Sequence, residues 1–296
     1  MLSLLASRTP PPPIPPSIYF GGCAYGSCYY VGVYKAMLEV WGSDFASKTL
    51  LTGDSAGVIL VVGITLQYTP EFIKQMYCDS SELTPWGLFD KDPFQAIDKC
   101  TLQKLITGPD DKTPMKDTYK KLNQKIRIGA SIFPDKHYWV DSWNSDEELL
   151  HSMRNTLHLP IICHRRFHTH VNDQEVVDGA FCMTGKDMAH GDQTLYIGTN
   201  KGADVFAELT VKQTVLPNRG IVLHELEELG YVSFMKWAAE GGIIKKKNKK
   251  VRYLIQCILW VCKGLHLIQN QGTFVKEWVY GLFLKAVNIS GPFRST

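Results

Sequence analysis

The sequence has few cysteines, no long apolar segment and little net charge, and each shortage excludes a class of protein. Eight cysteines among 296 residues, with no Cys-x-x-Cys pair, are too sparse for a disulfide scaffold and lack the spacing of zinc ribbons and redox motifs. We therefore expect reduced thiols. The apolar run at residues 253–262 covers only ten residues, well short of the roughly 20 that a membrane-spanning helix needs.

The N-terminal segment also lacks the apolar core of a secretory signal peptide. Residues 1–16 hold a short apolar stretch, then Arg8 and a proline tract. We interpret this segment as a Pro-rich leader, either a stiff polyproline extension or an SH3-type ligand. The missing signal predicts an intracellular protein, located in the cytoplasm or held peripherally at a membrane or lipid droplet.

The basic charge is confined to one segment. The net charge is +3, whereas residues 245–252 alone contain six Lys and Arg side chains, so the rest of the chain is slightly acidic. No nucleic-acid partner is therefore expected. The basic run and the apolar run after it, residues 245–262, could together lie on an anionic membrane surface. A solvated linker or a nuclear-localisation segment fits the same charges.

Short apolar runs alternate with helical repeats along the chain, a pattern typical of α/β proteins. The expected strands are residues 18–20, 49–52, 126–132, 137–140, 176–177 and 194–198. The expected helices are residues 33–41, 58–66, 70–78 and 93–107, and one that begins at Ser145. We predict a three-layer α/β/α domain with a mostly parallel central sheet over residues 17–241. A basic and apolar helical tail, residues 242–296, is expected to follow it.

The segment Gly53-Asp54-Ser55-Ala56-Gly57 fits Gly-x-Ser-x-Gly, the turn by which many hydrolases pass sharply from a strand into a helix. Gly53 and Gly57 permit the bend, and the bend exposes the serine hydroxyl at a helix N-terminus. An apolar strand before it and an apolar helix after it supply the expected context. The pattern indicates a nucleophile at Ser55, and the alternative is a tight turn without chemistry.

A loop rich in small residues, residues 21–27, lies between the first expected strand and the first expected helix. Its backbone amides can point into the same pocket as Ser55 and hold the oxyanion that forms when an ester carbonyl is attacked. A nucleotide-phosphate loop is disfavoured, because Gly-x-Gly-x-x-Gly is not satisfied and no Lys-Ser/Thr pair follows.

The base that would activate Ser55 has two kinds of candidate. Asp178, followed by Gly179 and preceded by a short expected strand, is a carboxylate that could accept the serine proton directly. In ordinary α/β-hydrolases the order is Ser, acid, His, and His190 or His224 would then serve. That order is weaker here because only one strand precedes the elbow. Asp54 adjoins Ser55 on a tight turn, so we expect it to face solvent or brace the loop.

Taken in order, the small-residue loop, the Gly-x-Ser-x-Gly segment and Asp-Gly-Ala at 178–180 resemble the patatin-like phospholipases over about residues 18–200. The match is closest to the animal patatin-domain branch, on Tyr19–Tyr25 and Tyr29–Val33. The resemblance implies a catalytic dyad of Ser55 and Asp178. The further positions that it implies are Gly53 and Gly57 for the nucleophile elbow and Gly22, Cys23 and Ala24 for the oxyanion hole.

The resemblance implies a lipid acyl hydrolase that acts on a phospholipid or an acylglycerol. Ser55 attacks the ester, Asp178 accepts its proton, and water releases the fatty acid from an acyl-enzyme, with no metal or cofactor. Two departures motivate a rival, a patatin-fold protein with impaired catalysis that binds lipid or acts as a scaffold. Ala24 and Ser27 stand where glycines are usual, and residues 181–185 replace the usual Asn and Pro. A Ser-His-Asp carboxylesterase is the weaker alternative.

A histidine cluster with two arginines invites a metal hypothesis. His164, His168 and His170 are close in sequence, and His168 and His170 would share one face of a strand. Zinc needs a fourth ligand, and no Cys or carboxylate supplies one at the usual spacing. We interpret the cluster as a solvated or lipid-headgroup-facing basic segment and expect no metal.

Overall fold

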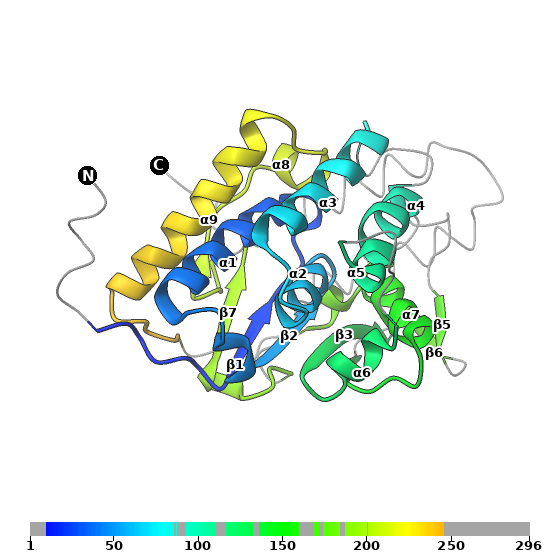
Figure 1. Cartoon of the computed structure of the whole chain (residues 1–296), viewed down its shortest axis with the longest axis horizontal. Coiled ribbons are helices and arrows are strands. Elements are labelled where there is room, and N and C mark those ends of the chain that lie inside the picture. The colour runs from blue at the N-terminus through cyan, green and yellow to red at the C-terminus, as the bar shows by residue number, and fades with distance from the viewer. Residues whose placement is uncertain are drawn as a thin grey trace.

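The computed structural model of the chain describes residues 10–85, 87, 93–109, 116–132, 136–159, 169–171, 174–183, 187–199 and 201–245. Over these residues the strands form one eight-stranded sheet of order β5-β6-β3-β2-β1-β7-β8, with β4 also paired to β3. Figure 1 shows the helices gathered along this sheet. The strands are β1 Ser17–Phe20, β2 Leu50–Asp54, β3 Ile126–Ile132, β4 Lys136–Val140, β5 Thr169–Val171, β6 Gln174–Val177, β7 Thr194–Gly198 and β8 Val205–Phe206.

The middle of the sheet is parallel. Strands β3, β2, β1, β7 and β8 run in one direction. β4 and β6 pair antiparallel with β3, and β5 pairs antiparallel with β6. β1 lies between β2 and β7 and is buried along its whole length, so its polar side chains need partners. Ser17 shares a hydrogen bond of 2.7 Å with Thr194 on β7. The predicted α/β class with a mostly parallel central sheet and flanking helices is confirmed.

The helices begin where the sequence supplies caps. Thr69 accepts a hydrogen bond from the Phe72 amide, and Ser145 accepts one from the Glu148 amide, so both N-termini are satisfied. Residues 93–107 are one helical stretch as predicted, with a π-helical segment, Asp98–Leu102, in its middle. The helices are α1 Cys28–Trp41, α2 Gly57–Thr65, α3 Pro70–Leu83, α4 Pro93–Ile97, α5 Gln103–Thr107, α6 Thr118–Leu122, α7 Asp146–Thr156, α8 Val211–Val215 and α9 Ile221–Ala239.

Helix α9, which we had not predicted, packs on α1 with the two backbones in contact. A methyl group added to Gly32 would lie 1.7 Å from the Glu227 carbonyl oxygen, and one added to Gly230 would lie 1.8 Å from the Tyr29 carbonyl oxygen. Each helix therefore has a glycine where the other crosses it. The buried Glu227 carboxylate pairs with Lys35 of α1 and with Lys74 of α3 (2.5 Å for Lys74), which ties the three helices together.

Both ends of the described chain pack on the domain. Pro12 and Pro15 are buried, and their carbonyls accept hydrogen bonds from the Trp41 indole (2.8 Å) and the Thr49 hydroxyl (2.7 Å). At the other end the Lys245 amide donates to Asp204 at 2.6 Å. Residues 1–9 and 246–296, which hold most of the predicted tail, lie outside the described residues, and the predicted boundaries near 17 and 241 stay predictions.

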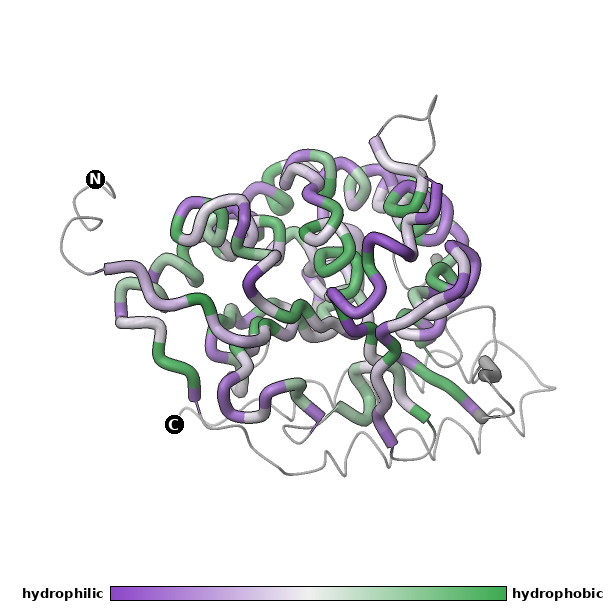
Figure 2. The backbone as a smooth tube through the Cα atoms, turned by 60° about the horizontal axis from the view of Figure 1, so that its bottom comes forward, coloured by the Kyte–Doolittle hydropathy of each residue, from purple (hydrophilic) through white to green (hydrophobic). Residues whose placement is uncertain are grey.

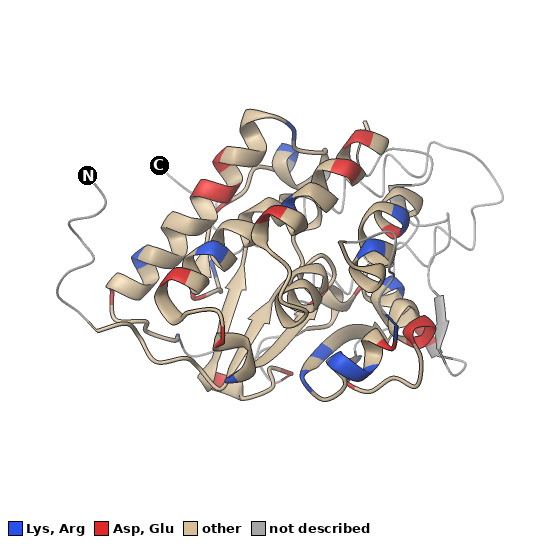
Figure 3. Ribbon diagram, viewed as in Figure 1, with Lys and Arg blue, Asp and Glu red and all other residues tan. Residues whose placement is uncertain are grey.

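The core lies between the sheet and the helices. Figure 2 shows hydrophobic and hydrophilic residues alternating along the helices, as expected where one face of each helix packs on the core. Helix α2 is buried from Gly57 to Ile64, as its apolar sequence predicts. Acidic and basic residues are spread over several helices (Figure 3). No helix of the described residues combines the length and apolarity needed to cross a bilayer.

Candidate active site

The sheet register brings the two predicted catalytic residues together. Strand β2 ends with Asp54 opposite Gly129 of β3, and β6 ends with Val177 opposite Ser131 of the same strand. The ends of β2 and β6 therefore lie opposite positions of β3 that are only two residues apart, Gly129 and Ser131. The residues that follow these ends are Ser55 and Asp178.

Ser55 has the strained backbone of a nucleophile elbow. Its φ is +48°, in the left-handed region, and α2 begins two residues later at Gly57. A methyl group on Gly57 would lie 2.2 Å from the Phe20 carbonyl oxygen, so this position needs glycine for close packing on β1. At Gly53 a methyl group would lie 2.9 Å from Val61, a milder restriction. The sharp strand-to-helix turn predicted from the pentapeptide is therefore present.

The Ser55 hydroxyl donates a hydrogen bond of 2.6 Å to Asp178 Oδ2. The other carboxyl oxygen, Oδ1, accepts from the Ala180 amide at 2.9 Å, which fixes the orientation of the carboxyl group. Both side chains are buried, with Asp178 only 1% exposed. Burial raises the pKa of Asp178 to about 7, against the opposing effect of the hydrogen bonds from Ser55 and Ala180. The pair can therefore exchange a proton near neutral pH.

The small-residue loop lies against Ser55. A methyl group on Gly22 would lie 3.0 Å from Ser55 Cβ and 2.9 Å from Ala180 Cβ, so the loop backbone passes directly beside the hydroxyl. Within the described ranges, the amides of Gly22, Cys23 and Ala24 donate no hydrogen bond to the chain. These amides are thus available to a ligand at Ser55, as the predicted oxyanion hole requires.

Ala24 adopts the conformation that glycine would adopt. Its φ is +46°, in the left-handed region that costs a non-glycine residue about 1–2 kcal/mol. Ser27, the other departure from the family pattern, donates from its hydroxyl to the Ala24 carbonyl at 2.6 Å and so braces the turn. The loop therefore keeps a turned shape without glycine at either position.

The remaining predicted candidates lie away from the Ser55 hydroxyl. Asp54 is fully buried and accepts a hydrogen bond from Tyr19 at 2.5 Å, so the expectation that it faces solvent is wrong and the bracing role is the one observed. The reason is that it is the last residue of a covered strand. His190 and His224 have exposed side chains. His164 and His168 lie outside the described residues, and among those described no cluster of three metal-ligating side chains occurs.

Residues 155–159, at the C-terminal end of α7 and directly after it, contribute to the site, and sequence analysis missed them. The Thr156 hydroxyl accepts a hydrogen bond from the Ser55 amide at 2.8 Å, and the His158 carbonyl accepts one from the Asp178 amide at 2.9 Å. One short segment thus holds the backbones of both members of the pair. No local pattern marks these residues, because each acts through a contact distant in sequence.

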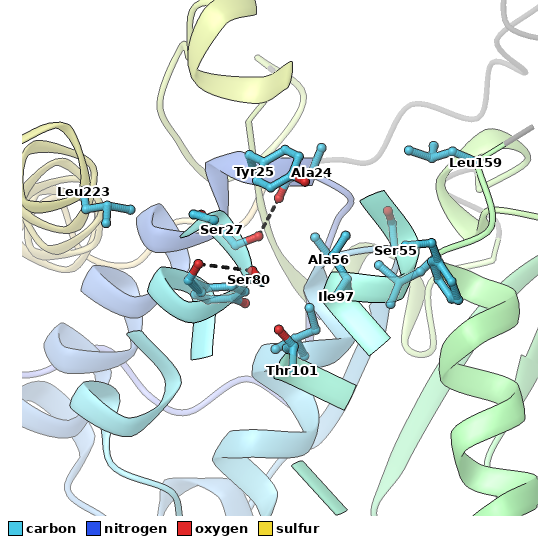
Figure 4. Close-up of a pocket in the computed structure, with 15 residues that line it drawn as sticks. Ala24, Tyr25, Ser27, Ser55, Ala56, Ser80, Ile97, Thr101, Leu159 and Leu223 are labelled. Carbon is cyan, nitrogen blue, oxygen red and sulfur yellow. Dashed lines mark hydrogen bonds between the residues drawn. The ribbon is translucent and has the colours of Figure 1, made fainter. Parts of the chain in front are cut away.

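A cavity of about 680 Å³, part of it open to solvent, adjoins Ser55. Most of the described residues that line it are apolar or aromatic, and none of those is charged. Figure 4 shows Ser55 and Ala56 beside Ile97, with Ala24 and Tyr25 on the opposite side of the cavity from Thr101. The Ser55 hydroxyl therefore adjoins a space whose described lining is mainly apolar.

Comparisons with known proteins give only distant matches. No protein-family profile and no curated protein matches the chain. The solved structure of VipD from Legionella pneumophila is 10% identical with a TM-score of 0.36, covering 77% of this chain and 67% of that one. The type III effector protein ExoU is 12% identical with a TM-score of 0.37, and the match covers 80% of this chain but 55% of ExoU. The assignment to the animal patatin-domain branch stays a prediction.

Proposed function

We propose that the protein is a patatin-like lipid acyl hydrolase in which Ser55 is the nucleophile and Asp178 is the general base. The observation that carries this proposal is the hydrogen bond of 2.6 Å from the Ser55 hydroxyl to a buried carboxyl oxygen of Asp178. A serine hydroxyl is a weak nucleophile until a base within hydrogen-bond reach accepts its proton. Asp178 meets that requirement without an imidazole.

The reaction proceeds in two halves. Ser55 Oγ forms a bond to the acyl carbonyl carbon while its proton passes to Asp178 Oδ2, and the amides of Gly22, Cys23 and Ala24 stabilise the oxyanion. The intermediate collapses to an acyl-enzyme, and Asp178 returns the proton to the departing alcohol. A water molecule then gives a proton to Asp178 while its oxygen attacks the acyl carbon. The bond from Ser55 Oγ to the acyl carbon breaks, Asp178 returns the proton to Ser55 Oγ, and the fatty acid leaves.

The pKa of Asp178 suits this role. A general base works best when its pKa is near the working pH, and burial raises this one to about 7. The base must be ionised, so kcat/KM is expected to rise as pH rises through about 7 and to level off above it. A carboxylate with an ordinary pKa would be ionised but much less basic, and proton transfer from serine would be harder.

The cavity favours an acyl group as the part of the substrate held next to Ser55. Apolar surface comes from Ile59, Phe94, Leu157 and Leu223. Among the described lining residues no charged side chain is present to hold a phosphate or a free carboxylate. A neutral acyl chain is therefore the best fit, with the alcohol portion toward solvent. A phospholipid or an acylglycerol supplies such an ester, and residues 245–262 are proposed to bring the site to an anionic membrane surface.

Two rivals make different demands on the site. An impaired lipid-binding protein would need an oxyanion loop distorted by Ala24, whereas Ala24 adopts the left-handed conformation of a glycine. A Ser-His-Asp carboxylesterase would need an imidazole at Ser55, whereas His190 and His224 are exposed and the hydroxyl donates to Asp178. Both observations favour the dyad.

Hydrolysis of a short soluble nitrophenyl ester and of a long-chain phospholipid by matched variants tests the proposal. Asp178→Asn is expected to lower kcat by at least about 10³-fold, as the loss of a catalytic base does elsewhere. The double variant His190→Ala, His224→Ala is expected to keep most of the activity. Loss of activity in the histidine variant, with folding intact, would instead support a triad.

A further inference from the structure

Two buried hydroxyls in the cavity have no hydrogen-bond partner within the described part of the chain. They are the phenol of Tyr77 on α3 and the side-chain hydroxyl of Thr101. Both residues line the same cavity as Ser55, and they are only 7% and 1% exposed. Buried polar groups in folded proteins are nearly always paired, so an unpaired set in a ligand cavity points to a polar atom of the ligand.

Other hydroxyls in this cavity are satisfied by the chain itself. Ser27 donates to the Ala24 carbonyl at 2.6 Å, and Ser80 donates to the Tyr77 carbonyl at 3.1 Å, as the dashed lines of Figure 4 mark. The missing partners are therefore specific to Tyr77 and Thr101 and are not a general property of the cavity wall.

The local backbone explains why Thr101 is left unpaired. A threonine inside an α-helix commonly donates to the carbonyl four residues before it, and Thr65 and Thr107 do so at 2.9 and 3.1 Å. Thr101 belongs to the π-helical segment Asp98–Leu102 and makes no such bond. Single π-helical turns inside helices occur frequently at functional sites. Here the π-helical turn coincides with a hydroxyl that the helix itself does not satisfy.

Tyr77 is a neutral donor under all ordinary conditions. Burial raises its pKa well above the usual value, against a smaller opposing effect of the nearby Ser27 hydroxyl, so its phenol keeps its proton. Ser27 does not meet the phenol in hydrogen-bond geometry. The comparable buried phenol of Tyr68, which lies outside the residues that line the cavity, donates to the Leu105 carbonyl at 2.9 Å. Tyr30, Tyr34 and Tyr68 give this proton to backbone carbonyls, whereas Tyr77 does not.

We propose that Tyr77 and Thr101 form a polar subsite inside the acyl cavity that binds a neutral oxygen carried along the acyl chain, so that the preferred substrate is an ester of a hydroxylated fatty acid. The proposal rests on the proposed function, because it takes the cavity to hold the acyl chain. Tyr77 donates to the substrate oxygen, and Thr101 can donate or accept, so a substrate hydroxyl is satisfied in both senses. Because none of the described lining residues is charged, a carboxylate or a phosphate is disfavoured at this point.

Binding by the Ser55→Ala variant tests the subsite without any need for hydrolysis. The ligands are methyl stearate and methyl hydroxystearates that carry the hydroxyl at successive mid-chain carbons, titrated by calorimetry. At least one hydroxylated ester is expected to bind roughly tenfold more tightly than methyl stearate, the size of one well-made neutral hydrogen bond. Adding Tyr77→Phe or Thr101→Val is expected to remove most of that preference.

Tyr68→Phe is the matched control, since it deletes a buried phenol that is already paired. It is expected to keep the binding preference and to lower the unfolding temperature, whereas Tyr77→Phe is expected not to lower it. Equal binding of plain and hydroxylated esters would mean that the two hydroxyls meet only water and would overturn the proposal. A preference that survives both Tyr77→Phe and Thr101→Val would overturn it as well.

Steady-state hydrolysis of the same esters by the unmodified chain separates this proposal from the proposed function. If neither ester is hydrolysed while the Ser55→Ala variant still prefers the hydroxylated one, the hydrolase proposal fails and the subsite stands. If both are hydrolysed with equal kcat/KM and bound equally, the hydrolase proposal stands and the subsite fails.

Discussion

Replacing Asp178 with Asn is expected to remove hydrolysis and, at alkaline pH, to make the folded protein more stable. The carboxyl group is buried, and burial raises its pKa from 3.8 to about 7. Above pH 7 the carboxyl is charged in both folded and unfolded chains, and only the folded chain bears the cost of desolvation. A pKa raised by this amount corresponds to a cost on the order of 4 kcal/mol.

The pH dependence has a definite sign. Between about pH 4 and pH 7 the folded chain holds a proton that the unfolded chain has lost, so this group's contribution to the free energy of unfolding decreases as pH rises. Asn has no proton to lose, and its amide oxygen can still accept from the Ala180 amide. The stability gain of Asp178→Asn is therefore expected to be small near pH 4 and to grow to several kcal/mol near pH 8.

Urea denaturation of both proteins across this pH range measures the difference directly. A gap that widens with pH supports a buried, poorly solvated base. If the variant is less stable than the unmodified chain at about pH 8, or if the gap is the same at both ends of the range, then burial does not raise the pKa of Asp178 and the reasoning is wrong.

Three further outcomes follow from the same structure. Gly230→Ala is expected to lower the free energy of unfolding, measured by urea denaturation, by about 3 kcal/mol because the new methyl group meets the Tyr29 carbonyl. The control Glu228→Ala, at an exposed position of the same helix, should change it by no more than about 0.5 kcal/mol, and equal effects of the two variants would contradict the close helix crossing. Ala24→Gly is expected to keep ester hydrolysis and to change the free energy of unfolding by no more than about 1 kcal/mol. Ala24→Val should lower the rate of hydrolysis and the free energy of unfolding, since a β-branched residue resists a φ of +46°, and an active, stable valine variant would refute this backbone argument. A chain that ends after Lys245 keeps the hydrogen bond to Asp204 and should hydrolyse a soluble ester, while its binding to anionic vesicles becomes weak and insensitive to salt. Binding of the full chain should fall as salt rises, because charge attraction at a surface is screened over about 8 Å at physiological ionic strength, and equal vesicle binding by both chains would remove the tether from the proposal.

Elements whose signal is local could be predicted from the sequence. The bounds of β3 and β7 match the expected runs, and Thr69 and Ser145 begin their helices as caps. Helix α9 was missed because Gly230 interrupts its helical pattern, and the reason for that glycine is a contact with α1, nearly 200 residues earlier in the chain.

The candidate site also combines features that a local sequence pattern predicts with features that only the assembled fold determines. The sharp turn at Ser55 follows from its flanking glycines and from the apolar strand and helix around it, so a five-residue pattern was enough to identify it. The meeting of Ser55 and Asp178 depends on the register of β2 and β6 on β3, which no local pattern encodes. The contacts of Thr156 and the π-helical turn at Thr101 are likewise products of the assembled fold.

Covalent labelling by a fluorophosphonate probe tests the central claim most directly, because the probe reacts only with a serine whose hydroxyl is activated and whose oxyanion site is formed. The unmodified chain is expected to be labelled at Ser55, the Ser55→Ala variant is expected not to be labelled, and labelling should slow strongly in Asp178→Asn. A folded, unmodified chain that the probe leaves unlabelled, or labelling that persists in Ser55→Ala, would contradict the account.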